Sequence, residues 1–484
     1  MNYSQPNFRL DQKDWLKGNN VYDEFPEGAA VATTVGINSI SKPGLLTQSP
    51  ALGSAVTGSL PANGVISWGI GSGASAPAVA AVYTNSSNNG AWYSVNSSTG
   101  AMTVVGSNDT TRSYKLGITD TVFYNGSFYT TSETDICKNS ADLATRDQSW
   151  WITTSAKTAL TSGVPHPMLV YESIMYIADG RYLHKLDGTT ISLQVWDAPV
   201  DHIITAMAEY NGLIYITAEP YKDLTGSVHG LTQMFSWDGL LESWYEQYFL
   251  DYRINSLYVY KNRLYAWTND YLALWTGSEM EPIYTVSNQV FKCHITATSD
   301  SMFFVDGTTI VRYGKPFTPN LTRKFYRYLS ASAALPFTGI ISTSGDSMII
   351  TEQHASASPN YFLADVNTPA STGTRTLTFN KRFFSQPVKP RAVVITLGQV
   401  LASGQAVKVG YNDMHGDAQY PSADSGTFQY STVKMRDLIA WEFTLNSKEM
   451  TRSVEPVIQI TGGAYVRSID YLYGPSENPI KKSA

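Results

Sequence analysis

Five aspartates occupy positions where they could act as general acids or bases. They stand beside short predicted strands, in segments rich in turn residues: Asp179, Asp187, Asp238, Asp270 and Asp306. Glycoside hydrolysis needs two carboxyl groups that face each other across a sugar ring, and loops near a common axis could supply such a pair. Asp is also a preferred turn residue, because its side chain accepts hydrogen bonds from nearby backbone N–H groups. The turn role is the favoured interpretation, and a glycosidase stays a minor alternative.

The histidines show no metal-binding pattern. None of the spacings HxH, HExxH or HxxxH occurs, although a site assembled from distant segments stays an open alternative. Asp201 and His202 form the one adjacent acid–imidazole pair, and we interpret them as surface polar residues. The seven positions are His166, His184, His202, His229, His294, His354 and His415.

Sequence motifs for catalysis are equally missing. The stretch GIGSG at Gly69–Gly73 lacks the G-x-G-x-x-G spacing and the Lys-Ser/Thr of a phosphate loop, so we predict an ordinary loop there. The chain has no G-x-S-x-G elbow, no kinase or metalloprotease motif and no S-x-D-x-G-x-T-W box of the sialidases. The sequence therefore predicts a protein that is not an enzyme and that uses no cofactor and no metal.

The composition favours strands and disfavours nucleic-acid binding. Charged residues make up 15% of the 484 positions, whereas soluble domains average roughly 25%. The 31 Tyr and the many Ser, Thr and Asn suit pleated, half-buried surfaces. The net charge of −6 argues against a nucleic-acid groove. A limited basic patch, for example around Arg323, Lys324 and Arg327, stays an alternative, and the favoured interpretation of these residues is a solvated face. Such a composition is common outside cells or inside assembled particles.

The cysteines and the hydrophobic segments limit the cellular context. Cys137 and Cys293 form neither a CxxC motif nor a disulfide framework, and we predict two small buried residues. The first 15 residues lack the basic and apolar regions of a signal peptide, which predicts synthesis in a cytoplasm. No run of 18 apolar residues occurs, so membrane insertion is not predicted.

A hairpin pattern recurs along the chain and predicts how these residues are positioned. In EYNGLIYIT, Glu209–Thr217, an Asn-Gly step precedes an apolar run, as in a two-residue hairpin turn. Similar runs recur at separations of 46, 47, 39, 50, 39 and 46 residues, and their aromatic or aliphatic anchors are Tyr83, Tyr129, Tyr176, Tyr215, Tyr265, Phe304 and Ile350. A period of about 40–50 residues with one hairpin per unit is typical of a propeller blade. We therefore predict an all-β chain with a six- or seven-bladed β-propeller over residues 61–370.

The regions outside the repeat are predicted to fold differently. Residues 1–60 are rich in turn residues but contain the apolar residues Trp15, Tyr22, Phe25, Ile37 and Leu45, which predicts an extended arm that docks on other surfaces. A strand from this arm that closes the propeller is the alternative. Residues 371–474 contain seven short segments, several with alternating polarity, which predict a β-sandwich. Residues 475–484 are predicted to be a tail.

The arm resembles a known group of proteins. Its stretch GINSISKPGLL, Gly36–Leu46, is similar to the segment that precedes the first blade in the propeller-containing tail proteins of tailed bacteriophages. The matching residues are Asn38, Lys42, Pro43 and Gly44, whereas Ser41 stands where a second basic residue is usual. The YNG-x-LY hairpins and the closing RSIDYLYG segment are similar to that group as well.

The resemblance implies a structural role in a virion tail. Members of the group form a nozzle or hub ring below the portal and adaptor, commonly of six copies, that retains and conducts DNA. It implies a homo-oligomer, other tail proteins as partners and assembly in the host cytoplasm, with assembly residues in the arm: Trp15, Phe25, Asn38, Lys42, Pro43 and Gly44. A tail protein that binds host-surface glycans is the first alternative, and a propeller glycosidase is the second.

Overall fold

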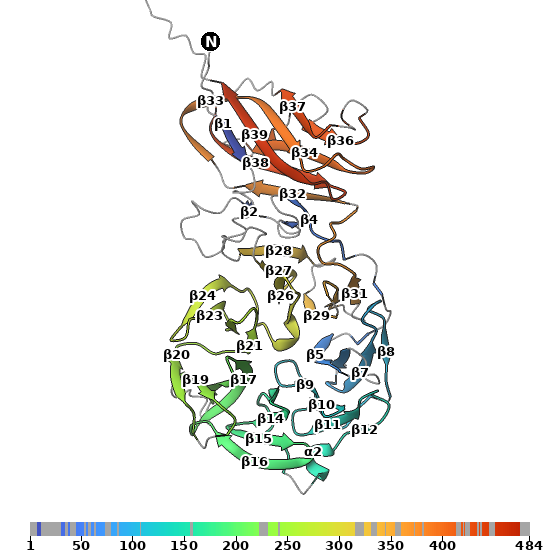
Figure 1. Cartoon of the computed structure of the whole chain (residues 1–484), viewed down its shortest axis with the longest axis vertical. Helices are drawn as coiled ribbons and strands as arrows, with labels where there is room; N and C mark the ends of the chain where they lie inside the picture. Colours follow the sequence, from blue (N-terminus) through green and yellow to red (C-terminus); the bar gives the residue numbers. More distant parts are fainter. Residues whose placement is uncertain are drawn as a thin grey trace, which may run out of the picture. The chain divides into compact units, whose positions relative to one another are not determined.

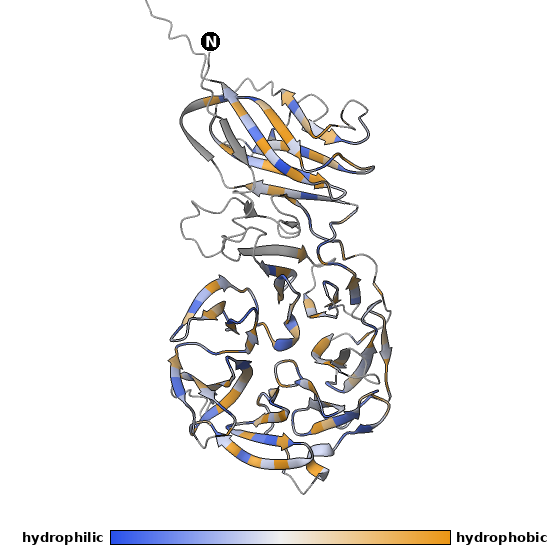
Figure 2. Cartoon of the chain, in the orientation of Figure 1, coloured by the Kyte–Doolittle hydropathy of each residue, from blue (hydrophilic) through white to orange (hydrophobic). Residues whose placement is uncertain are grey.

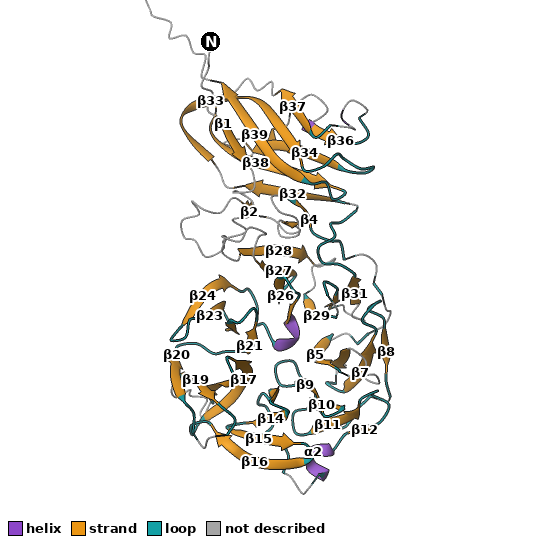
Figure 3. Ribbon diagram, in the orientation of Figure 1, coloured by secondary structure: helices purple, strands orange, loops and turns teal. Residues whose placement is uncertain are grey.

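The structure, a computed structural model, describes most of the chain. The described residues are 7–10, 31–33, 37–38, 45–52, 55–56, 60–61, 64–72, 79–84, 87–106, 108–154, 158–221, 231–240, 243–314, 324–330, 336–343, 345–353, 360–371, 373–379, 382–412, 418–419, 421, 426–432, 435, 438–444 and 451–474. Within them the fold is nearly all β (Figure 3), and the helices are one turn, α2 (Trp150–Thr153), and a 3₁₀ turn, η1 (Lys292–His294).

Small antiparallel sheets dominate the middle of the chain (Figure 1). Six have four strands and one has three, and the strands of each sheet pair in sequence order. Their bounds are β5–β8, Val65–Ile70, Val79–Thr84, Gly90–Val95 and Met102–Val104; β9–β12, Thr121–Tyr124, Ser127–Thr131, Ile136–Ser140 and Arg146–Asp147; β13–β16, Met168–Tyr171, Ile174–Asp179, Tyr182–Asp187 and Thr190–Asp197; β17–β20, His202–Tyr210, Leu213–Pro220, Thr232–Trp237 and Glu246–Leu250; β21–β24, Ser256–Val259, Leu264–Trp267, Tyr271–Trp275 and Met280–Thr285; β25–β28, Ile295–Ala297, Ser301–Asp306, Thr309–Gly314 and Lys324–Ser330; and β29–β31, Phe337–Ser342, Met348–Glu352 and Asn360–Leu363.

The hairpin repeat predicted from the sequence is confirmed. All seven predicted anchors lie in the second strand of their sheet, and each is less than a tenth exposed. Both central residues of the turn before that strand have positive φ in four consecutive sheets, as in type I′ hairpins: Asn125-Gly126, Glu172-Ser173, Asn211-Gly212 and Lys261-Asn262. Turns of this type match the right-handed twist of paired strands, which explains why the pattern recurs.

Neighbouring small sheets pack through their first strands. β5 contacts β9, β9 contacts β13, β13 contacts β17 and β17 contacts β21; β25 contacts β29, and β29 contacts β5. Apolar clusters join adjacent sheets, for example the cluster that contains Tyr176, Trp196, Ile216 and Trp237. The second strands are buried along most of their length, whereas β16 has a single buried residue, Trp196, and its hydrophobic and hydrophilic residues are mixed along the strand (Figure 2).

The last third of the chain contributes to one ten-stranded sheet with the order β1-β39-β33-β38-β32-β2, to which β34–β37 are added. The predicted segments of residues 371–474 contain strands, and β35 is an addition. The C-terminal strands are β32 (Thr374–Phe379), β33 (Arg382–Leu397), β34 (Ala406–Asn412), β35 (Ala418–Gln419), β36 (Thr427–Gln429), β37 (Ala440–Thr444), β38 (Thr451–Thr461) and β39 (Val466–Gly474). The N-terminal strands are β1 (Asn7–Leu10), β2 (Val31–Thr33), β3 (Ile37–Asn38) and β4 (Thr47–Gln48).

The chain divides into two compact units. The unit of small sheets comprises Leu52–Ile310 and Ala331–Asp365. The C-terminal unit comprises Met1–Ala51, Val311–Ser330 and Val366–Ala484, so it also holds β28 and most of β27. The division thus differs from the predicted order of arm, propeller and sandwich, because the N-terminal segment belongs to the same unit as the C-terminal strands. Strand pairing is the reason, since β1 and β2 pair with β39 and β32.

Replacement of Gly212 by valine is expected to destabilise the unit of small sheets by about 1–2 kcal/mol. Gly212 has φ +73°, which a β-branched residue rarely adopts, whereas a Cβ added at this position would meet no heavy atom within 4 Å. The cost is therefore backbone strain alone. Chemical denaturation measures it, and Gly212→Asn, which tolerates this conformation, should lose less than Gly212→Val. Equal losses in both variants would contradict the assignment.

Candidate functional site

The N-terminal segment is built into the C-terminal sheet. β1 pairs antiparallel with β39, with Phe8 opposite Tyr471 and Arg9 opposite Asp470. β2 pairs with β32, at the other end of the strand order. An unpaired sheet edge exposes backbone groups that invite another strand. Two pieces of the same N-terminal segment therefore cover both ends of this strand order.

The predicted assembly motif lies between two paired strands. β3 pairs with β4, and Asn38 stands opposite Thr47 in that ladder. The structure thus places the backbone of Asn38, one of the six predicted assembly residues. The other five lie outside the described residues: Trp15, Phe25, Lys42, Pro43 and Gly44. Their predicted role stays a prediction.

Leu46 and Gln48, which follow Gly44 in the sequence, anchor the N-terminal segment in the C-terminal core. Leu46 is fully buried and exchanges two backbone hydrogen bonds of 2.9 Å with Val466. Gln48 is 1% exposed; its Nε2 donates to the carbonyls of Gly373 (3.1 Å) and Ile460, and its Oε1 accepts from the backbone N–H of Gly463 (3.1 Å). No sequence pattern predicted this role of Gln48, because its partners lie 325–415 positions away.

Leu45 shows how closely the segment is packed. A Cβ added to Gly398 would lie 2.6 Å from a methyl carbon of Leu45. This distance is far below van der Waals contact, so position 398 accommodates only glycine while Leu45 is in place. The close approach couples the loop after β33 to the N-terminal segment.

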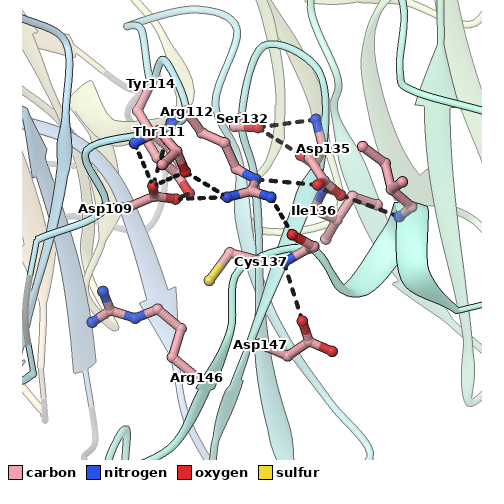
Figure 4. Close-up of polar contacts among 12 residues, drawn as sticks. Asp109, Thr111, Arg112, Tyr114, Ser132, Asp135, Ile136, Cys137, Arg146 and Asp147 are labelled. Atoms are coloured by element: carbon pink, nitrogen blue, oxygen red, sulfur yellow. Dashed lines mark hydrogen bonds and ion pairs between the residues drawn. The ribbon is translucent and has the colours of Figure 1, made fainter.

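A buried charge cluster lies in the unit of small sheets (Figure 4). Arg112 stands between two buried carboxylates: Nε donates to Asp135 Oδ2 over 3.1 Å, and Nη1 lies 3.7 Å from Asp109 Oδ2. Nη2 donates to the hydroxyl of Ser149. Asp109 also accepts hydrogen bonds from Tyr114 and from the backbone of residues 111 and 112. The cluster joins the connection between β8 and β9 to the turn before β11 and to the start of α2.

Burial shapes the protonation of this cluster. Desolvation raises the pKa of Asp135, and hydrogen bonds from Arg112 and from backbone N–H groups oppose that rise. Desolvation likewise raises the pKa of the Cys137 thiol to about 12. A thiol that stays protonated is a poor nucleophile. The cluster is thus suited to holding segments together.

The five predicted aspartates do not form a described carboxylate pair. Asp179 accepts from the backbone N–H of Thr161 (2.7 Å), Asp238 from the backbone of Leu240 (2.8 Å), and Asp306 from the backbone of Ser287 (2.6 Å). Asp179 and Asp187 end neighbouring antiparallel strands at opposite ends of one hairpin. The Asp238 contact is local, as the turn role requires, whereas Asp179 and Asp306 accept from backbone N–H groups 18 and 19 positions earlier and so join separate segments. The prediction that the chain is not an enzyme stays a prediction.

The described histidines are buried, and two of them lie beside the same carboxylate. His166 and His184 each lie 3.9 Å from a different oxygen of Asp179, and His202 bonds to the carbonyls of Val200 and Leu231. His202 is buried, so the prediction of a surface Asp201-His202 pair is wrong for the histidine, while Asp201 is exposed. Among the described residues no three His, Cys, Asp or Glu side chains form a metal-binding group. His229, His354 and His415 lie outside the described residues.

The buried side chain of His294 is expected to make the folding stability of the chain sensitive to acid. Burial lowers the pKa of His294 to about 4, and the backbone N–H of Phe291 donates to its Nδ1 over 3.3 Å. Between pH 6.5 and 4 the unfolded chain therefore binds one more proton than the native chain, and stability falls as the pH falls. The contribution is about 3 kcal/mol. Denaturation at pH 7 and pH 4 should show a smaller loss for His294→Asn than for the natural chain; an equal loss would contradict it.

Four smaller predictions remain, and one of them concerns side chains outside the described part of the chain. Cys137 and Cys293 are buried free thiols, as predicted. The predicted loop at Gly69–Gly73 begins inside β5, where a Cβ on Gly69 would meet the methyl group of Thr121 at 2.7 Å. Lys324 and Arg327 belong to β28, and neither their side chains nor Arg323 are described. No described helix is long and apolar enough to cross a membrane.

Comparisons with known proteins assign no family to the chain. No protein-family model matches it, and no curated protein sequence matches it. Among solved structures it is similar to the extracellular domain of a protein described as a putative one-component system from B. thetaiotaomicron, with a TM-score of 0.43 and 9% identity. The match covers 87% of this chain and 61% of the other chain.

Proposed function

We propose that the seven small sheets are the blades of a β-propeller and that the C-terminal sheet folds as a β-sandwich. Contacts from first strand to first strand, including those between β29 and β5, support the propeller. One apolar core that collects residues from β33, β37 and β39 as well as from β32, β34 and β38 supports the sandwich. The sequence period of 39–50 residues points to the same arrangement.

We further propose that the chain is a structural protein of a bacteriophage tail, a nozzle or hub component that retains and conducts DNA. The observation that carries this proposal is the N-terminal segment, which supplies strands to both ends of the C-terminal strand order. Segments that order by adding strands to a sheet are a common way to build assemblies. The motif residues Asn38, Lys42, Pro43 and Gly44 stand between the pieces of that segment that the structure places.

The proposed partners are further copies of this chain in a ring, commonly six, and the neighbouring tail and adaptor proteins. The low content of charged residues and the net charge of −6 suit a conduit, because DNA is not held by a basic surface. The proposed location is the virion tail, after assembly in the host cytoplasm.

Mass and shape measurements test the proposal. Light scattering coupled to size exclusion should give a closed oligomer of about six copies, and negative-stain images should show rings. Antibodies against the chain should label the tails of virions. A chain that stays monomeric at high concentration and is missing from purified virions would overturn the proposal.

A further inference from the structure

A cavity of about 460 Å³ opens inside the unit of small sheets. Its walls come from five sheets: residues 116–118, 163–165, 253–255 and 289–291 precede the first strands β9, β13, β21 and β25, residues 203–205 lie in β17, and residues 219–221 are at the end of β18. All these segments belong to one compact unit. A concave site of this size suits a ligand of one or two rings.

The cavity lining has no net charge. Its charged residues are Glu219 and Arg253, which form a bidentate pair through Nε and Nη2 of the arginine. The Glu219 side chain is 5% exposed and the Arg253 side chain is 57% exposed, so the arginine covers the acid. Because the two charges cancel, the lining favours neither a phosphate nor a cation.

Two amide side chains of the lining, Asn255 and Gln289, share one acceptor, Asn269, which is not among the lining residues. Asn255 Nδ2 and Gln289 Nε2 both donate to Asn269 Oδ1, each over 3.0 Å. The shared acceptor fixes how both amides are turned. Each amide then presents a carbonyl oxygen and a second N–H, and this pair of groups matches a hydroxyl, which donates and accepts at once.

Aromatic rings complete the lining. Tyr221 is 50% exposed and Phe291 is half-buried, and both border the cavity. An aromatic ring can cover the apolar C–H face of a pyranose while polar groups bind its hydroxyls. We propose that this cavity binds a neutral saccharide. The inference goes beyond the structural role proposed above and holds whether or not the chain forms a ring.

Saturation-transfer NMR and calorimetry on the full chain test this site. The probes are methyl glycosides of glucose, galactose, mannose and N-acetylglucosamine, and a dissociation constant on the order of millimolar is expected for ligands of this size. Binding of at least one probe supports the site. Failure of all four probes to bind at concentrations well above the millimolar range would overturn it.

Variants locate the bound sugar. Gln289→Leu keeps the side-chain volume but removes the amide, and Tyr221→Ala removes an exposed ring that few core contacts depend on. Each should weaken binding about tenfold. Asn108→Ala, at an exposed amide outside the cavity, is the matched control and should bind as the natural chain does. Unchanged binding in Tyr221→Ala and in Gln289→Leu would place the sugar elsewhere and refute the proposal, whatever the oligomeric state proves to be.

Discussion

Replacement of Arg112 by methionine is expected to lower the free energy of unfolding by about 3–5 kcal/mol. The guanidinium is 14% exposed, and its partners Asp109 and Asp135 are 0% and 1% exposed. Methionine fills a similar volume but leaves two buried carboxylates without a counter-charge. Chemical denaturation of the unit of small sheets measures the loss.

A surface ion pair supplies the matched control for Arg112. Arg181 bonds to Asp197, whose side chain is 54% exposed, and exposed pairs contribute roughly 0–1 kcal/mol. Arg181→Met should therefore cost less than about 1 kcal/mol. A similar cost in both variants would show that Arg112 contributes no more than a surface charge.

The pH dependence gives the Arg112 variant a second signature. Burial already raises the pKa of Asp135, and removal of Arg112 takes away the one positive charge that, together with backbone N–H groups, opposes that rise. Between the ordinary pKa of an Asp in the unfolded chain and the raised pKa of Asp135 in the variant, the native variant binds a proton that the unfolded chain has released. Its stability therefore increases as the pH falls through this range. The loss of unfolding free energy caused by Arg112→Met should thus be smaller at pH 5 than at pH 8. A constant deficit would contradict this electrostatic origin.

Replacement of Gln48 by leucine is expected to destabilise the C-terminal unit by about 4 kcal/mol. Leucine has a similar shape but cannot bond to the carbonyl of Ile460 or the N–H of Gly463, and each buried group left unpaired costs about 1–3 kcal/mol, whereas the Gly373 carbonyl still accepts from the N–H of Gly462. The N-terminal segment should also detach more readily. Calorimetry measures the first effect, and the rate of proteolysis near the N-terminus measures the second.

Gln405 is the matched control in the same unit. Its Oε1 accepts one exposed hydrogen bond from the backbone N–H of Ala402 over 2.8 Å. Gln405→Leu should change the free energy of unfolding by less than about 1 kcal/mol, because water replaces the lost partner. If Gln48→Leu changes the free energy of unfolding as little as Gln405→Leu does, the buried amide of Gln48 does not anchor the N-terminal segment.

Local patterns were predictable from the sequence. Asn211 and Gly212 have φ of 52° and 73°, which a two-residue hairpin needs and which these residue types tolerate. The anchors such as Tyr215 and Tyr265 were equally recognisable, because a strand with an apolar run beside such a turn has one favourable register.

Long-range pairings were not predictable. Arg112 and Asp109 are three positions apart and suggest a local pair, but Asp135 is 23 positions away and joins only where the connection between β8 and β9 meets the turn before β11. On the sequence alone, β1 and β2 are also assigned to a separate arm. These strands have four and three residues, and so short a segment does not specify a partner strand near the other end of the chain. The burial of Gln48 follows from the same distant partners.

The pairing of β1 with β39 has a consequence for the timing of synthesis. The first strand leaves the ribosome more than 450 residues before its partner, from Leu10 to Val466. At roughly 5–20 residues per second this delay lasts on the order of 20–90 seconds. During this interval β39, the partner of β1 in the folded chain, has not yet been made. The native pairing of β1 can therefore form only after the C-terminal strand has been synthesised.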